Sequence, residues 1–139
     1  MRIAKVSLIV QSLFYIFAGI NHFMHQRFYV HIMPDHYAHP EALVRLSGIA
    51  EILGGIGLLA PFARRISSVG IAAMLIVFFD VHIYMLRHAD RFPEAPRSIL
   101  WARIPLQFVL IAWALYYARS YRIHTAPLLG NPVPNGRLC

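Results

Sequence analysis

Six polar or ionisable side chains interrupt apolar segments of this sequence, and they are of types that bind ligands or exchange protons. They are Asn21, His22, Glu51, Asp80, Arg103 and Gln107. A charged group in hydrocarbon is unfavourable by roughly 3 kcal/mol or more unless it is paired, hydrated or turned toward the interior of a bundle. A cluster of such groups on different helices therefore predicts a functional site inside a membrane.

Each residue type has an expected role at such a site. Carboxylates can move protons, and a guanidinium can stabilise negative charge, so we expect the catalytic groups to be Glu51, Asp80 and Arg103. Amides, imidazoles and phenols can hold a polar ligand, so we expect the ligand-binding groups to be Asn21, His22, Gln107 and Tyr84. The spacing predicts no metal centre, and the weak candidates for metal ligands are His22 and His82.

Four apolar segments must position these side chains. The chain is 58% hydrophobic and 14% charged, which is too apolar for an ordinary soluble domain. We predict an all-α membrane protein with an up-down bundle of four transmembrane helices at about residues 6–24, 43–63, 66–86 and 98–118. Residues 1–118 then form the transmembrane domain, and residues 119–139 form a basic cytoplasmic tail.

Lys and Arg residues divide unevenly between the two sides of such a bundle. The side of both termini carries basic residues without an acid, namely Arg2, Lys5, Arg64, Arg65, Arg119, Arg122 and Arg137. The other side mixes both signs, with Arg27, Arg87, Arg91, Arg97, Asp35, Glu41, Asp90 and Glu94. The positive-inside rule then predicts cytoplasmic N and C termini for a multi-pass protein of the bacterial inner membrane. These loops and their contacts with anionic lipid explain the net charge of +7, so we expect no nucleic-acid partner.

Depth along the predicted helices brings the polar side chains into one layer. At 1.5 Å per residue, all four helices place their polar groups in the half of the bundle away from the termini. Gly48, Glu51 and Gly55 are spaced i, i+3 and i+7, so the carboxylate shares a face with residues that allow close helix contact. Asp80 and Tyr84 share a face of the third helix, from which His82 points about 160° away, so His82 is the weaker candidate.

Two other features of the sequence bear on metal or redox chemistry. The first outer loop, residues 25–40, contains His25, His31, His36 and His39 at irregular spacing. We interpret them as interfacial polar residues that cap the bundle, with metal binding or pH sensing as the minority alternative. A single cysteine, Cys139, allows no thiol relay within the chain.

A structural interpretation of the polar cluster stands beside the functional one. In it Arg103 neutralises Glu51 and Asp80, and Asn21, His22 and Gln107 satisfy the remaining hydrogen bonds. Such ion pairs can hold the register of helices without any chemistry.

Several short motifs resemble the DoxX family of small four-helix membrane proteins, over about residues 12–117. They are Gly19-Ile20-Asn21-His22-Phe23, Ile32-Met33-Pro34, the segment from Ser47 to Leu59 followed by Pro61 and Arg64-Arg65, and Arg103-Ile104-Pro105-Leu106-Gln107. The resemblance implies a four-helix fold and an association with membrane oxidoreductases of thiol, sulfur or quinone metabolism. In the third helix the chain has His82 where the family pattern has Asn, which favours a role for His82.

Three classes of function remain open from the sequence. The first is a membrane subunit of an oxidoreductase whose site holds a quinone head group, with quinone as its cofactor. The second is a non-catalytic scaffold that binds a partner protein. The third is a haem or metal-binding membrane protein that uses His22 and His82, as axial ligands in the case of haem. The partners expected are the lipid bilayer, a redox protein or membrane subunit, and a second copy of the chain.

Overall fold

Four long helices make up most of the computed structural model, which describes residues 2–120. They are α1 (Arg2–Met24), α3 (Pro40–Leu59), α4 (Arg64–Arg87) and α5 (Arg97–Ser120). Each is long and apolar enough to cross a membrane, and no strand occurs between residues 2 and 120. The predicted all-α bundle of four membrane-spanning helices is confirmed, and the chain is a multi-pass membrane protein.

The outward faces of these helices are apolar. Large side chains such as Phe17, Trp101 and Phe108 are more than 60% exposed. A soluble protein rarely leaves so much contiguous apolar surface in water. These faces suit contact with lipid chains.

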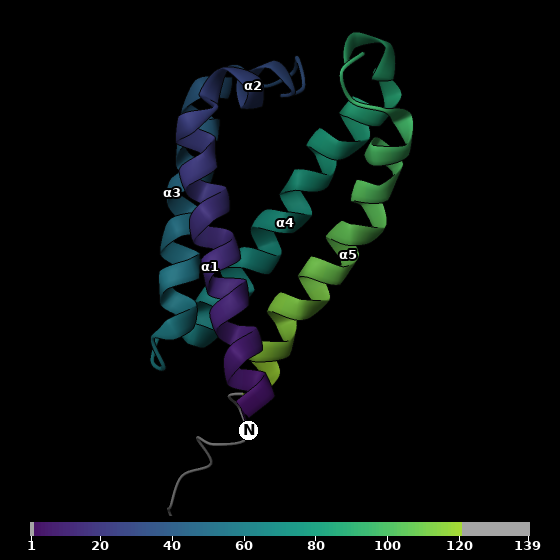
Figure 1. Cartoon of the computed structure of the whole chain (residues 1–139). Helices are drawn as coiled ribbons and strands as arrows, with labels where there is room; N and C mark the ends of the chain where they lie inside the picture. Colours follow the sequence, from purple (N-terminus) through teal and green to yellow (C-terminus); the bar gives the residue numbers. More distant parts are fainter. Residues whose placement is uncertain (1, 121–139) are drawn as a thin grey trace, which may run out of the picture.

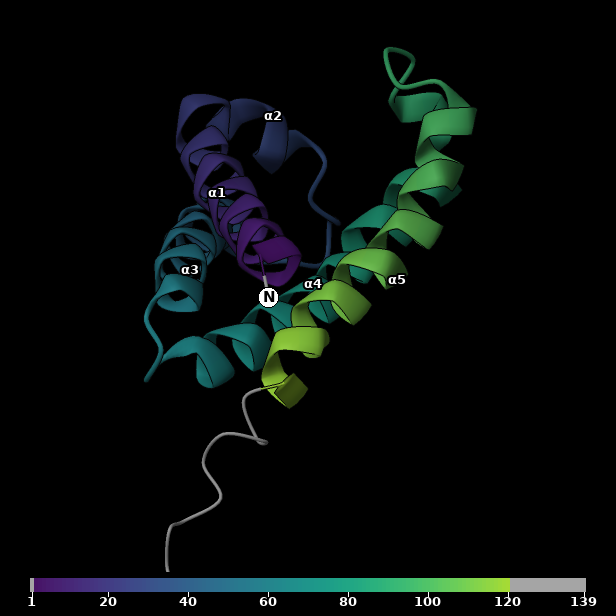
Figure 2. The ribbon, with the colours of Figure 1, turned by 60° about the horizontal axis from the view of Figure 1, so that its bottom comes forward.

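The helices form two antiparallel pairs, α1 with α3 and α4 with α5 (Figure 1). The pairs converge where the N-terminus and the end of α5 lie, which we name the terminal end, and they diverge toward the opposite, loop end (Figures 1 and 2). At the terminal end the Trp113 indole donates to Ser7 at 3.0 Å, and the Tyr117 hydroxyl donates to the Ala4 carbonyl at 3.1 Å. The space between the pairs therefore widens toward the loop end.

Glycines bring α1 and α3 into close contact. A Cβ atom at Gly19 would lie 2.5 Å from the Gly48 carbonyl, and one at Gly48 would lie 3.0 Å from the Gly19 carbonyl. About two turns farther along both helices, the Ser12 hydroxyl donates to the Gly55 carbonyl. Small residues at such contacts let helix backbones approach in a membrane, where dispersion replaces the hydrophobic effect.

We expect Gly19→Ala to destabilise the bundle, because the new methyl group would overlap backbone that cannot move aside. Overpacking of this kind costs about 1–3 kcal/mol. Gly70→Ala is the matched control, since nothing lies within 4 Å of a Cβ atom there. Thermal unfolding in mild detergent measures both variants. Equal melting temperatures for Gly19→Ala and wild type would contradict the proposed close contact.

The helix bounds differ from the predicted ones at several ends. The second long helix covers Pro40–Leu59 instead of 43–63, because Pro61 keeps the preceding Ala60 extended at φ −81° and ψ 116°. Arg64 Nε donates to the Leu58 carbonyl at 2.8 Å, which gives this carbonyl in the last turn of α3 a hydrogen-bond partner. The other three long helices are each longer than predicted by one to four residues at one or both ends. The predicted tail at 119–139 lies outside the described residues except for the last residues of α5.

The loop end contains two short helices in the connections between the predicted spans. They are α2 (Gln26–His31) and the 3₁₀ helix η1 (Ala89–Arg91). After α2 the chain crosses to the other helix pair, where Ile32 packs with Met85, Phe92 and Leu100. This segment closes the loop end over the widening space between the pairs.

Candidate functional site

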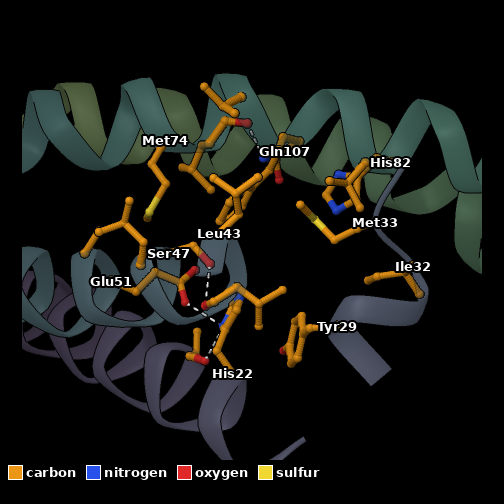
Figure 3. Close-up of a pocket in the computed structure, with 18 of the residues that line it drawn as sticks. His22, Tyr29, Ile32, Met33, Leu43, Ser47, Glu51, Met74, His82 and Gln107 are labelled. Carbon is orange, nitrogen blue, oxygen red and sulfur yellow. Dashed lines mark hydrogen bonds and ion pairs between the residues drawn. The ribbon is translucent and has the colours of Figure 1, made fainter. Parts of the chain in front are cut away.

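A cavity of about 490 Å³ lies between the two helix pairs, below the loop that follows α2 (Figure 3). All four long helices and α2 contribute to its walls, which are mainly apolar. Its polar lining comes from both pairs: Tyr15, His22, Ser47 and Glu51 on one side, and His82, Arg103 and Gln107 on the other. The predicted polar layer therefore contains a cavity. Five candidates from the sequence line it, namely His22, Glu51, Arg103, Gln107 and the weaker candidate His82.

His22 and Glu51 form a buried pair on the α1–α3 wall. His22 Nδ1 lies 3.0 Å from Glu51 Oε2 and 2.9 Å from the Ala18 carbonyl oxygen. Since a carbonyl can only accept, Nδ1 carries a proton. The hydrogen is directed at Ala18, so Glu51 Oε2 has no well-directed hydrogen bond from any residue between 2 and 120. The carboxylate keeps acceptor capacity beside the cavity.

Tyr29 and Asn21 hold His22 in place. The Tyr29 ring stacks on the imidazole with 3.9 Å between ring centroids. Asn21 Nδ2 lies 2.8 Å from the Tyr29 hydroxyl, and Asn21 Oδ1 lies 2.8 Å from His25 Nδ1. Asn21 itself is absent from the cavity lining. The amide predicted to bind ligand instead supports the ring that packs on His22.

Arg103 has no carboxylate partner among residues 2–120. Arg103 Nη1 donates to the Met85 sulfur at 3.3 Å, whereas Glu51 pairs with His22. Asp80 pairs with His36. The structural interpretation in which Arg103 neutralises both acids is therefore wrong. A cation that lines an apolar cavity without an acid partner is suited to contact an electron-rich group.

Gln107 and His82 lie on the α4–α5 wall of the cavity (Figure 3). Arg103 lines the same wall. Gln107 Nε2 donates to the Leu75 carbonyl at 2.5 Å and so ties α5 to α4. His82 Nδ1 is buried without a hydrogen-bond partner in the described part of the chain. A polar atom in this state is unfavourable unless a ligand or water satisfies it.

The structure brings His82, the weaker candidate, to the cavity rather than Asp80. His82 lines it, and Asp80 and Tyr84 do not. The two residues were correctly placed on opposite sides of α4, but the rotation of α4 in the bundle turns His82 inward. That rotation depends on packing against α5 and α3, which the spacing along one helix does not contain.

Asp80 and Tyr84 instead anchor the loop that follows α2. The Tyr37 hydroxyl donates to Asp80 at 2.9 Å, and His36 Nε2 lies 3.0 Å from the same carboxylate. Farther out, Arg91 bridges Asp35 at 3.0 Å and the Tyr84 hydroxyl at 2.8 Å. Arg91 holds the pKa of the Asp35 carboxyl below its ordinary value. These contacts hold Tyr37 and Met33 over the cavity, which both residues line.

We expect Asp80→Asn to lower the pKa of Tyr37. The hydrogen bond to Asp80 raises the pKa of the Tyr37 hydroxyl, because the carboxylate favours the protonated phenol. The stabilisation of the fold by this hydrogen bond is fully present below the ordinary tyrosine pKa of about 10. It is lost as pH rises through the higher pKa of Tyr37 in the folded protein. A ¹³C NMR titration measures the pKa of Tyr37 in wild type and in Asp80→Asn. An unchanged Tyr37 pKa in Asp80→Asn would show that the contact does not form.

Some residues of the site were not predicted from the sequence. Tyr15 lies on the same face of α1 as Ala18 and His22, at intervals of three and four residues, so helical spacing could have found it. Tyr29 and Met33 come from the segment expected to be a loop, where no periodicity relates them to the cavity.

The cavity is partly open toward the lipid-facing surface. Its lining includes Phe14, Leu46 and Val77, which are 46%, 63% and 61% exposed. An apolar molecule dissolved in the bilayer can therefore reach the polar groups from the side. Within residues 2–120, no three His, Cys, Asp or Glu side chains gather closely enough to hold a metal ion.

Comparisons with known proteins place the chain in a family without an assigned role. Residues 11–118 match the family described as "Domain of unknown function (DUF8561)", and the chain belongs to this family. No curated protein and no solved structure matches the sequence or the fold. The matched range covers the whole cavity, so the cavity belongs to the family domain.

Proposed function

We propose that this member of the DUF8561 family is an integral membrane subunit of an oxidoreductase, and that its cavity binds the head group of a membrane quinone. One observation carries the proposal: Arg103, a cation without a carboxylate partner in the described chain, lines an apolar cavity opposite the His22–Glu51 pair. The resemblance to the DoxX family supports the link to an oxidoreductase.

The two walls complement the two ends of a quinone head group. Such a head group has carbonyl oxygens on opposite edges of a flat ring and an apolar tail that extends into lipid. Arg103 donates hydrogen bonds toward one oxygen and stabilises negative charge there. The His22–Glu51 pair faces the other oxygen and holds a proton on Nδ1.

Reduction of a quinone to a quinol consumes two electrons and two protons. In this proposal a reduced partner protein supplies the electrons, since the chain has one cysteine, Cys139, and no internal dithiol. His22 and Glu51 deliver protons by general acid catalysis, for which an imidazole and a carboxyl group are suitable. Gln107 keeps α4 and α5 in register, so that His82 and Arg103 face the ligand.

The proposed orientation in the membrane is based on the distribution of Lys and Arg residues. The excess of Lys and Arg on the side of both termini supports cytoplasmic termini in a bacterial inner membrane. In that orientation the cavity lies in the outer half of the bilayer. A partner would then donate its electrons near the outer loops.

Ligand binding to the purified full chain tests the proposal. Short-tailed ubiquinone and menaquinone analogues are titrated into the protein in nanodiscs, and thermal unfolding is followed. We expect a saturable rise in melting temperature with a quinone. The control is the same alkyl tail without a quinone ring, which should give no saturable shift. Absence of a shift with every quinone would overturn the proposal.

A haem site is the second candidate, favoured by one observation. His22 and His82 both line the cavity, and they come from different helix pairs. Imidazoles facing each other across a bundle can bind both axial positions of a haem iron. A Soret absorption band in protein purified from cells with sufficient haem would support this alternative, and haem titration without a Soret shift would exclude it.

A further inference from the structure

A second group of polar side chains lies between the cavity and the terminal end, in the part of the bundle where the helix pairs converge. Gln11 and Ser68 are fully buried, and Tyr15 is 1% exposed. Neither amide atom of Gln11 nor the hydroxyls of Tyr15 and Ser68 have a hydrogen-bond partner in the described part of the chain. Leaving buried polar atoms unpaired is unfavourable, so these positions call for hydrogen-bonding partners that are neither side chain nor backbone.

Gln11 and Ser68 each lie on a helix face that carries residues of one apolar core. Gln11 lies between Leu8 and Tyr15 on one face of α1, at intervals of three and four residues. Ser68 precedes Ile71, Ala72 and Leu75 on the inward face of α4. Leu8, Tyr15, Ile71, Ala72 and Leu75 all belong to one buried cluster. Gln11 and Ser68, both fully buried, therefore lie on the faces of α1 and α4 that turn toward that cluster.

The same face of α1 leads from this cluster into the cavity. Gln11, Tyr15, Ala18 and His22 follow at intervals of four, three and four residues, over about 16 Å of helix. Tyr15, Ala18 and His22 line the cavity, and His22 contacts both the Ala18 carbonyl and Glu51. This face of α1 thus runs from the buried cluster to the His22–Glu51 pair, and Tyr15 lines the cavity between Gln11 and His22.

We propose that Ser68, Gln11 and Tyr15 hold internal water and form a proton path from the terminal end to the His22–Glu51 pair. Water satisfies buried polar groups that lack other partners, and hydroxyl groups can both accept and donate a proton along such a chain. The path replaces protons that the pair gives to a ligand in the cavity. Its use in quinone reduction rests on the proposed function, but its existence does not.

Hydration of the cluster is the first test. The full chain is reconstituted in vesicles of phosphatidylethanolamine and phosphatidylglycerol, and solid-state NMR measures polarisation transfer from water to the Gln11 side-chain nitrogen and to Tyr15. We expect faster transfer than to Leu58 and Ala114, which are fully buried and apolar. Transfer to Gln11 no faster than to Leu58 would overturn the proposal.

Proton exchange at His22 is the second test, made without any quinone. After transfer into D₂O, the loss of the His22 Nδ1–H signal gives the exchange rate, with the signal assigned by its absence in His22→Gln. We expect Tyr15→Phe and Gln11→Leu to slow the exchange about tenfold, as loss of one ordinary hydrogen bond in the path would do. If either variant does not fold, Ser68→Ala replaces it and should slow the exchange in the same way.

Tyr117→Phe is the matched control, because Tyr117 is a buried tyrosine of the same cluster whose hydroxyl already donates to Ala4. It should leave the His22 exchange rate unchanged. Equal rates in wild type and in the path variants would show that protons reach His22 from the loop end instead. Slowing by Tyr117→Phe to the same extent would assign the effect to general packing, which also contradicts the path.

Discussion

Replacing Arg103 with Met is expected to lower the affinity for a quinone by about 10- to 100-fold, the effect of losing a hydrogen bond from a charged donor. Met preserves much of the apolar stem, so the variant removes the guanidinium with little change in packing. The fold should be retained, because Arg103 makes no ion pair with any residue between 2 and 120 that its loss would break. Quinone titration in nanodiscs measures the change.

Two further variants sharpen this test. Arg97→Met removes an arginine from the exposed first turn of the same helix and should bind quinone as wild type does. Arg103→Lys keeps the charge but loses the planar group with several donors, so its affinity should fall between wild type and Arg103→Met. Wild-type affinity in Arg103→Met would remove the observation on which the proposed function depends.

Replacing His22 with Leu is expected to destabilise the protein by about 3–5 kcal/mol, because it leaves the buried Glu51 carboxylate without a partner. Glu51 is 4% exposed, its Oε2 has no hydrogen-bond donor within the described chain, and its ion-pair partner there is His22. Adding Glu51→Gln to the same chain should recover most of the loss, since the neutral amide is easier to bury than a charge. Denaturant unfolding in mild detergent measures each variant.

The asymmetry between the partners is part of this prediction. Glu51→Gln alone should have the smaller effect, because His22 keeps its hydrogen bond to the Ala18 carbonyl. Glu41→Gln is the matched control, an exposed carboxylate in the first turn of the same helix. If the losses of His22→Leu and Glu51→Gln simply add in the double variant, the two residues do not form an interacting pair.

Most of the fold could be predicted from the sequence because a membrane imposes strong local constraints. A helix must be apolar over about 20 residues to cross hydrocarbon, so composition alone located the four spans. Counting 1.5 Å per residue placed His22 and Glu51 at one level, and the structure pairs them at 3.0 Å. Helical spacing also placed Glu51 on the face with Gly48 and Gly55, both of which pack against α1.

The site itself was only partly predictable, since depth and face within one helix do not specify its neighbours. The sequence offered Arg103 as the partner of Glu51, but His22 lies on the helix that packs directly on α3, and Arg103 belongs to the other pair. The divergence of the pairs toward the loop end separates these groups and opens the cavity between them. Asp80 contacts Tyr37 and His36 in the loop after α2. That loop has no periodic pattern from which these contacts could have been predicted.

Hydropathy and the rise of a helix were enough to predict which segments span the membrane and at which depth their polar groups lie. Which of these polar groups meet could be seen only in the packed bundle. That depends on the rotation of each helix and on the angle between the pairs, and both are set by contacts such as Gly19 against Gly48 and Gln107 against Leu75. These contacts join residues far apart in the chain, and they place His82 and Arg103 at the cavity while leaving Asp80 outside it.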